Sequence, residues 1–233
     1  FTGAKFEFRA VGGSASPGFP VTLLNAAVAE AIGEVIEQIA AERAGGKSGD
    51  DAVLAVVRRA FKETAAVRFE GNNYSQEWVE EAARRGLPNF RHTPDALAQL
   101  VTDASRRTLT SLGILSDAEL ESRYHVRVER YVKDLLIETG TLLEIVNTMI
   151  LPSSYAYLGA LAAGAAQAKA AGITVIPQVA AANEVGALVE EVLRRRDALA
   201  ALVGDAEVSH DDLATQASML SRDGAERMLE LRE

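Results

Sequence analysis

The chain contains no cysteine among its 233 residues. This excludes disulfide bonds and thiolate metal sites, and it leaves the redox compartment undetermined. Histidine is also scarce, with only His92, His125 and His210. The three lie far apart in the sequence and none belongs to a recognisable metal-binding motif. We therefore expect all three to be surface or loop residues.

Basic residues are too few to balance the acidic ones. The chain has 24 Lys and Arg against 33 Asp and Glu, which gives a formal net charge of -9. This balance argues against non-specific binding to nucleic acids or anionic membranes, because both need basic patches. No signal peptide is recognisable, and we predict a cytoplasmic location. Since the chain starts at Phe1 rather than Met, we expect an excerpt or a processed product.

Long, strongly hydrophobic runs are missing as well. The most apolar stretch, residues 155–171, is rich in alanine and glycine and contains Gln167 and Lys169. It is too weakly hydrophobic to predict a membrane span. We predict neither a membrane nor a nucleic acid as partner.

The chain does contain enough apolar residues for a substantial core, and most follow a helical period. Ser116 and Glu119 have the spacing of a capping box, which predicts a helix start. Pro152 is the first breaker after it, so the sequence predicts a helix of roughly 35 residues. Its apolar stripe comprises Tyr124, Val128, Tyr131, Leu135, Leu142, Ile145 and Met149.

Shorter helical patterns lie on either side of this long one. They are predicted over residues 20–44, 50–64 (starting at Asp50 or Asp51), 75–85, 93–109, 179–203 and 212–231. Residues expected to be buried on them include Leu24, Val28, Ile32, Val35, Ile39, Val53, Val57, Phe61, Val185, Leu188, Val192 and Leu199. Small side chains from 159 to 170 are expected to let two helix backbones approach closely. The predicted fold is mainly α, an up-and-down helical bundle with one long Pro-kinked helix.

One strand is expected before the bundle. In residues 4–11, two phenylalanines alternate with Lys5, Glu7 and Arg9, the period of a strand. A solitary strand leaves its ladder hydrogen bonds unmade, so its partner strands are expected in polypeptide outside this chain. The charged face has two interpretations. It is either an exposed face with cross-strand ion pairs, or a site in which Glu7 binds Mg²⁺ or Mn²⁺ between two cations suited to phosphate oxygens.

Three other features are weaker candidates for a site. Arg194, Arg195 and Arg196 offer an anion site, but a solvated face near a helix end is favoured. Glu138 interrupts the long apolar stripe, where a buried carboxylate needs a partner. An arginine on a neighbouring helix is favoured over a catalytic role. The glycine-rich residues 12–18 match neither common phosphate-binding motif.

Residues 1–12, FTGAKFEFRAVG, resemble the late catalytic strand of type III glutamine synthetases. Three further stretches resemble the same class, so the resemblance covers nearly the whole chain. They are GNNYSQEWVEEA with RGLPN (71–82 and 85–89), LSDAELESRY (115–124) and ILP (150–152). The resemblance implies a C-terminal part of such an enzyme. Residues 1–19 would be a remnant of the catalytic domain, with a strand from its truncated sheet, and residues 20–233 a helical C-terminal domain.

The resemblance also implies roles for the three charged residues of the strand. Glu7 would be a ligand of a catalytic Mg²⁺ or Mn²⁺, and Arg9 would contact the substrate and the transferred phosphoryl group. Lys5 stands where better-known members carry an arginine that touches the ATP phosphates; lysine keeps the charge and loses the bidentate fork.

At the level of the whole enzyme, the resemblance implies glutamine synthesis from glutamate, ammonia and ATP through γ-glutamyl phosphate. It implies a homo-oligomer of stacked rings. The chain alone is expected to be inactive, because the other active-site residues would lie upstream. The alternative is that the helical part is an oligomerisation or regulatory module with no catalytic role.

Overall fold

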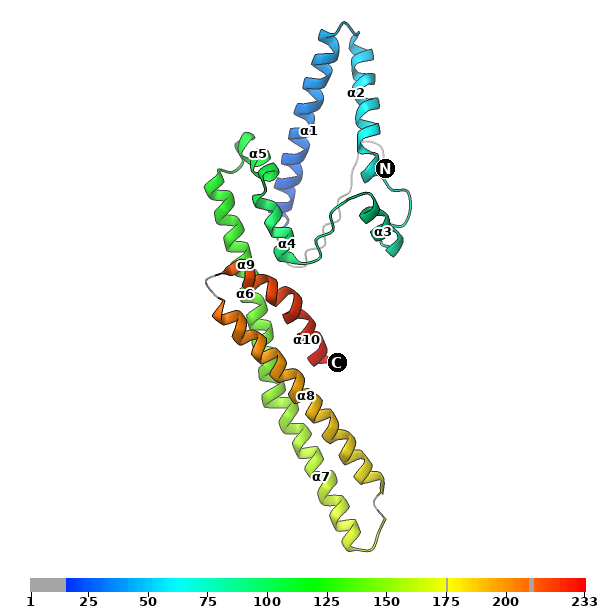
Figure 1. Ribbon diagram of the computed structural model, residues 1–233, viewed down its shortest axis with the longest axis vertical. Helices are drawn as coiled ribbons and strands as arrows, with labels where there is room; N and C mark the ends of the chain where they lie inside the picture. The colour runs from blue at the N-terminus through cyan, green and yellow to red at the C-terminus, as the bar shows by residue number, and fades with distance from the viewer. Residues whose placement is uncertain (1–15, 175, 210–211) are drawn as a thin grey trace. The chain divides into compact units, whose positions relative to one another are not determined.

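The computed structural model of the protein describes residues 16–174, 176–209 and 212–233, and these are almost wholly helical (Figure 1). The prediction of a mainly α chain is therefore confirmed. The predicted strand at 4–11 lies outside the described residues. The chain divides into two compact units. Each unit is made of two segments of the chain. The first unit consists of Phe1–Phe90 and Leu100–Leu120, and the second consists of Arg91–Gln99 and Glu121–Glu233.

The described part of the first unit begins with a helical hairpin, α1 (Gly18–Ala44) and α2 (Gly49–Glu63). Both helices lie close to their predicted positions. Ser48 starts α2, since its hydroxyl accepts a hydrogen bond from the backbone N–H of Asp51 at 3.2 Å. The hairpin is joined near its turn by Glu42, which pairs with Arg59 and with Lys47.

The predicted buried stripe on α1 is largely exposed. Val28 and Ile32 each have 54% of their surface accessible, while the small Ala26 is the buried residue. Ala26 packs in one cluster with Leu109 and Leu120. The helix forms as predicted, but the face that packs against the rest of the unit is not the predicted apolar stripe.

The predicted face of α2 is wrong for the same reason. Val53, Val57 and Phe61 are exposed, whereas Ala52 and Val56 are fully buried. Adjacent residues on a helix are separated by about 100°, so the buried face lies about 100° around the helix from the predicted one.

Arg85 connects the end of α3 (Gln76–Arg84) to the residues at the end of η1 (Thr64–Val67). Arg85 pairs with Glu81 at 2.6 Å and donates hydrogen bonds to the carbonyl oxygens of Ala66 and Arg68. The segment between the two helices is thereby fastened to α3. Figure 1 shows α3 as the short helix that follows this segment.

The helix predicted over 93–109 is broken into three pieces. They are α4 (Thr93–Ala98), η2 (Gln99–Val101) and α5 (Asp103–Ser111). Thr102 has an extended backbone, and its hydroxyl accepts a hydrogen bond from the N–H of Ser105 at 3.4 Å. Threonine is a better helix cap than interior residue, which explains why α5 starts there.

The long helix is longer than predicted. Its helical run covers Asp117–Ala170 and consists of α6 (Asp117–Ile145), the π-helical segment η3 (Val146–Ile150) and α7 (Leu151–Ala170). The capping box is confirmed, since the N–H of Glu119 donates to the Ser116 hydroxyl and the N–H of Ser116 donates to the Glu119 carboxylate.

Pro152 does not end this run, so the helix length predicted from that breaker is too short. Proline removes one helical N–H donor and crowds the carbonyl of the preceding turn. The wider π turn ends at Ile150, shortly before the proline, and changes the hydrogen-bond pattern there. Side chains also take up nearby carbonyl oxygens: Thr148 donates to Glu144 and Ser154 donates to Ile150.

In the second unit, α8 (Ile176–Val208) runs back along α7 (Figure 1). Leu199 is fully buried as predicted, but Leu188 is 61% exposed and Val189 is buried in its place. Most of the small residues from 159 to 170 are exposed, while Ala165 and Ala168 lie with Leu158 and Leu161 on the half-buried side of α7. The predicted close approach of two helices is seen between α7 and α8, with only part of these small residues on the half-buried side.

The chain ends with α9 (Leu213–Met219), the π-helical segment η4 (Leu220–Gly224) and α10 (Ala225–Arg232). Asp212 caps α9, since its carboxylate accepts a hydrogen bond from the backbone N–H of Thr215 at 3.1 Å. The segment 91–99 belongs to this unit, because Asp95 pairs with Arg222 at 2.9 Å and α4 packs against α9.

Two helical runs in the described part of the chain, Gly18–Ala44 and Asp117–Ala170, are long and apolar enough to cross a membrane. This result rests on length and composition alone. Helices that bury apolar faces against other protein pass the same test. The predicted absence of a membrane partner stays a prediction.

Candidate functional site

The sequence-predicted site residues Lys5, Glu7 and Arg9 lie outside the described residues. Their roles, and the binding of ATP and of Mg²⁺ or Mn²⁺, therefore stay predictions. Within the described part of the chain, no group of three or more His, Asp or Glu side chains could hold a metal ion.

The histidines occupy loop and surface positions where they are described. His92 lies just before α4, half-buried, with its Nδ1 3.2 Å from the carbonyl oxygen of Ser221. His125 is exposed and lies 3.4 Å from Glu121. His210 is outside the described residues. The prediction is confirmed for the first two, although His92 also connects the segment 91–99 to η4.

The three consecutive arginines of α8 are occupied by protein partners. Arg194 and Arg195 both pair with Glu191, and Arg195 also donates to the Glu230 carbonyl oxygen on α10. Arg196 pairs with Asp197 and donates to the Asn147 side-chain oxygen in η3 at 3.1 Å. Arg195 and Arg196 thus join α8 to two other elements rather than forming a wholly solvated face.

We expect this cluster to be visible in a titration of Glu191. Hydrogen bonds from Arg194 and then Arg195 lower the pKa of the Glu191 carboxyl from 4.5 to about 2. Because the folded-state pKa is the lower one, the pairing stabilises the fold above pH 4.5. That contribution is lost as the pH falls from about 4.5 through about 2. The Glu191 side chain is 39% exposed, so solvent screens the pair and its effect on stability is small.

NMR of the side-chain carboxyl carbon measures this pKa directly. Arg195→Met should move it upward toward 4.5, and Arg130→Met, which removes a different surface pair of α6, should leave it unchanged. An unchanged Glu191 titration in Arg195→Met would contradict the assigned cause.

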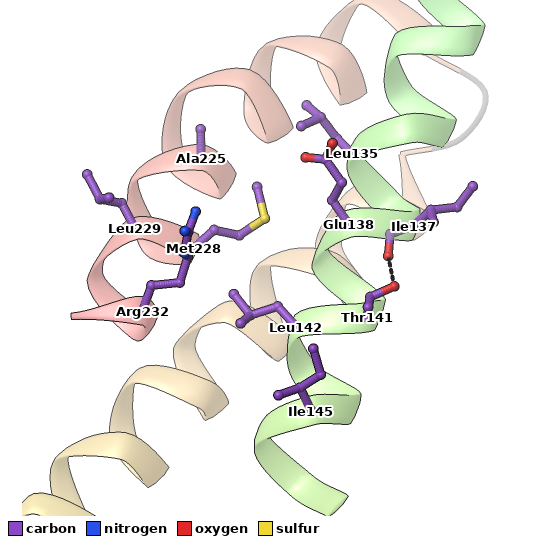
Figure 2. A pocket seen from close by; sticks show the side chains of 10 residues that line it. All are labelled: Leu135, Ile137, Glu138, Thr141, Leu142, Ile145, Ala225, Met228, Leu229 and Arg232. Atoms are coloured by element: carbon purple, nitrogen blue, oxygen red, sulfur yellow. Dashed lines mark hydrogen bonds between the residues drawn. The ribbon is translucent and has the colours of Figure 1, made fainter. Parts of the chain in front are cut away.

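The second unit also contains an apolar groove of about 730 Å³ between α6 and α10 (Figure 2). Leu142 and Met228 are half-buried there and pack against the core that contains Leu199. Ile137 and Leu229 stand at the edges, 66% and 58% exposed. The lining residues are Leu135, Ile137, Glu138, Thr141, Leu142, Ile145, Ala225, Met228, Leu229 and Arg232.

The groove has little polar chemistry. Its charged groups are Glu138 on α6 and Arg232 on α10, and the Thr141 hydroxyl donates to the Ile137 carbonyl oxygen (Figure 2). Glu138 is exposed and makes no ion pair with another described residue, so the predicted buried pair with an arginine is wrong. Such an apolar groove suits binding of another apolar surface.

Sequence reasoning missed this groove. The predicted stripe places Leu142 and Ile145 on a buried face, while Ile145 is 40% exposed. The one available signal is Ile137, an aliphatic residue outside the predicted stripe and next to Glu138. Which neighbouring helix partly covers the stripe is a tertiary feature.

Comparison with known proteins shows which family the chain belongs to. The family model described as the glutamine synthetase C-terminal domain matches residues 52–169, just over half of the chain. The chain belongs to this family. Its resemblance to the C-terminal part of type III glutamine synthetases is thereby confirmed.

Curated glutamine synthetases are similar over a larger part of the chain. The chain is 38% identical over 157 residues to the type-3 glutamine synthetase of Dictyostelium discoideum, covering 67% of this chain and 21% of that protein. It is 35% identical over 157 residues to a glutamine synthetase of Bacteroides fragilis (strain YCH46), covering 67% and 22%. The match therefore spans about a fifth of the length of these glutamine synthetases.

Proposed function

We propose that this chain is the C-terminal part of an ATP-dependent glutamate–ammonia ligase. The family match over residues 52–169, together with relatives named glutamine synthetase, carries this proposal. In the proposed reaction, the glutamate side-chain carboxylate takes the γ-phosphoryl group of ATP. Ammonia then attacks the resulting acyl phosphate, and phosphate leaves.

In the proposed site, Glu7 is a ligand of a divalent metal, Arg9 stabilises charge on the transferred phosphoryl group, and Lys5 contacts ATP phosphates. A carboxylate oxygen is a ligand that Mg²⁺ and Mn²⁺ prefer, so the donor type fits. A bound metal ion would neutralise charge on the phosphates. The 233-residue chain alone is expected to form no glutamine, because one carboxylate does not make such a site.

A second function is proposed for the helical bulk, that of an assembly module within a homo-oligomer. The groove between α6 and α10 favours it, because large aliphatic side chains at its edges remain more than half exposed. Contiguous apolar surface of this kind marks interaction sites. The two functions are compatible, since the strand would serve the chemistry and the helices the assembly.

We expect Leu229→Asp to weaken assembly of the full-length protein. A charge placed in an apolar contact costs on the order of 2 kcal/mol or more, about a 30-fold loss of association. Light scattering across a dilution series would show a lower mass than wild type. Val208→Asp is the control, because Val208 is 82% exposed and outside the groove. Identical masses for Leu229→Asp and wild type at every concentration would count against the assembly role.

A further inference from the structure

Helix α1 is apolar over most of its circumference. Val21, Val28 and Val35 recur at seven-residue intervals, which places them on one line along the helix. We call the large aliphatic residues on and beside this line the α1 stripe. It comprises Val21, Val28, Ile32, Val35 and Ile36, each between 38% and 60% exposed.

The described part of the first unit contacts other sides of α1. Ala26 and Leu23 pack with Leu109 of α5, and the Glu30 carboxylate accepts a hydrogen bond from Thr108 at 2.6 Å. Glu42, near the end of α1, pairs with Arg59 of α2. These contacts leave the α1 stripe uncovered.

A helix that is apolar on nearly all sides is typically enclosed by protein or lipid. The α1 stripe satisfies the sequence pattern of a buried face, yet none of the described residues buries it. The negative net charge and the absence of a basic belt do not favour an anionic lipid surface. A protein surface is therefore the fitting partner.

The family match indicates where that protein surface comes from. The C-terminal domain model begins at residue 52, beyond α1, so α1 is not part of the domain that this model describes. The relatives extend well beyond the matched fifth of their length. Polypeptide that precedes α1 in the same chain is also tethered directly to it, which gives it a far higher effective concentration than a second copy.

We propose that the α1 stripe is covered by an apolar face of the polypeptide that precedes Phe1 in the full-length protein. The domain boundary then lies in the connection between α1 and α2, at residues 45–48, instead of at residue 19. α1 becomes the last helix of the preceding domain and α2 the first helix of the C-terminal one. This inference rests on the proposed function only in assuming a full-length chain of the relatives' kind.

Thiol labelling of the full-length protein tests the proposal. Because these 233 residues contain no cysteine, a peptide from α1 carries only an introduced thiol. Val28→Cys and Ile32→Cys are compared with Glu37→Cys, an exposed position on another side of the same helix. Labelling is followed by mass spectrometry of the α1 peptide, and each folded rate is divided by the rate in denaturant.

We expect residues 28 and 32 to be labelled at least about a hundredfold more slowly than residue 37 in the folded protein. Equal labelling of the three positions would overturn the proposal. Protection that disappears when the oligomer is diluted to monomers would assign the stripe to a second copy and would also overturn it.

Glutamine formation by the same wild-type sample separates this proposal from the proposed function. Activity without protection contradicts only the covering of α1. Protection without activity contradicts only the ligase function.

Discussion

Glu7→Ala in the full-length enzyme is expected to abolish most glutamine formation. The change removes a carboxylate from the proposed metal site, and the loss of a metal ligand should exceed the 10- to 100-fold cost typical of an outer-shell change. We therefore expect turnover to fall about a hundredfold or more. The Mg²⁺ concentration needed for half-maximal activity should also rise, since fewer oxygen ligands hold the ion.

Steady-state rates measured across a Mg²⁺ titration give both quantities. Glu184→Ala is a suitable control, because Glu184 is an exposed glutamate on α8 with no proposed role. Near-wild-type turnover of Glu7→Ala at ordinary Mg²⁺ would rule out the ligand role. It would favour the other interpretation of the strand, in which Glu7 belongs to an exposed ion pair.

The largest expected effect on stability is that of Leu199→Ala. Leu199 is fully buried in the core formed by α8 with the α6–α7 run and α10. Removing a buried leucine side chain forfeits its burial and leaves a cavity, at a cost of about 2–5 kcal/mol. The free energy of unfolding should fall by that amount.

Leu188→Ala is the matched control on the same helix. Leu188 is 61% exposed, so its truncation should change the free energy of unfolding by about 0.5 kcal/mol or less. Urea unfolding followed by circular dichroism measures both variants. Equal losses would mean that Leu188 is as buried as Leu199, as the sequence predicts and the structure denies.

Local signals in the sequence located several helix ends correctly. The Ser116–Glu119 capping box, the helix end predicted at 85 and the helix start predicted at 212 all depend on hydrogen bonds or backbone angles within a few residues. Such features hardly depend on the remainder of the fold. The break at Thr102 is also local, but the neighbouring helical pattern concealed it.

The candidate sites also differ in whether the sequence alone could indicate them. The proposed roles of Glu7 and Arg9 come from the resemblance alone, since both lie outside the described residues. The groove between α6 and α10 has no sequence motif, because it depends on where α10 returns along the long helix. The hydrogen bonds of Arg195 likewise depend on partners on two helices, the Glu191 carboxylate on α8 and the Glu230 carbonyl oxygen on α10.

The sequence by itself determined that the protein is mainly helical, where most helices lie, and to which family the chain is similar. These features follow from short-range periodicity, helix capping and local sequence motifs, each of which involves residues close together in the chain. Tertiary structure decided which side of each helix is buried, as at Val28, Val57 and Leu188. The physical reason is that the hydrophobic effect depends on the amount of apolar area buried and has no preferred direction. Only the packing of distant segments therefore selects the face of each helix that becomes buried.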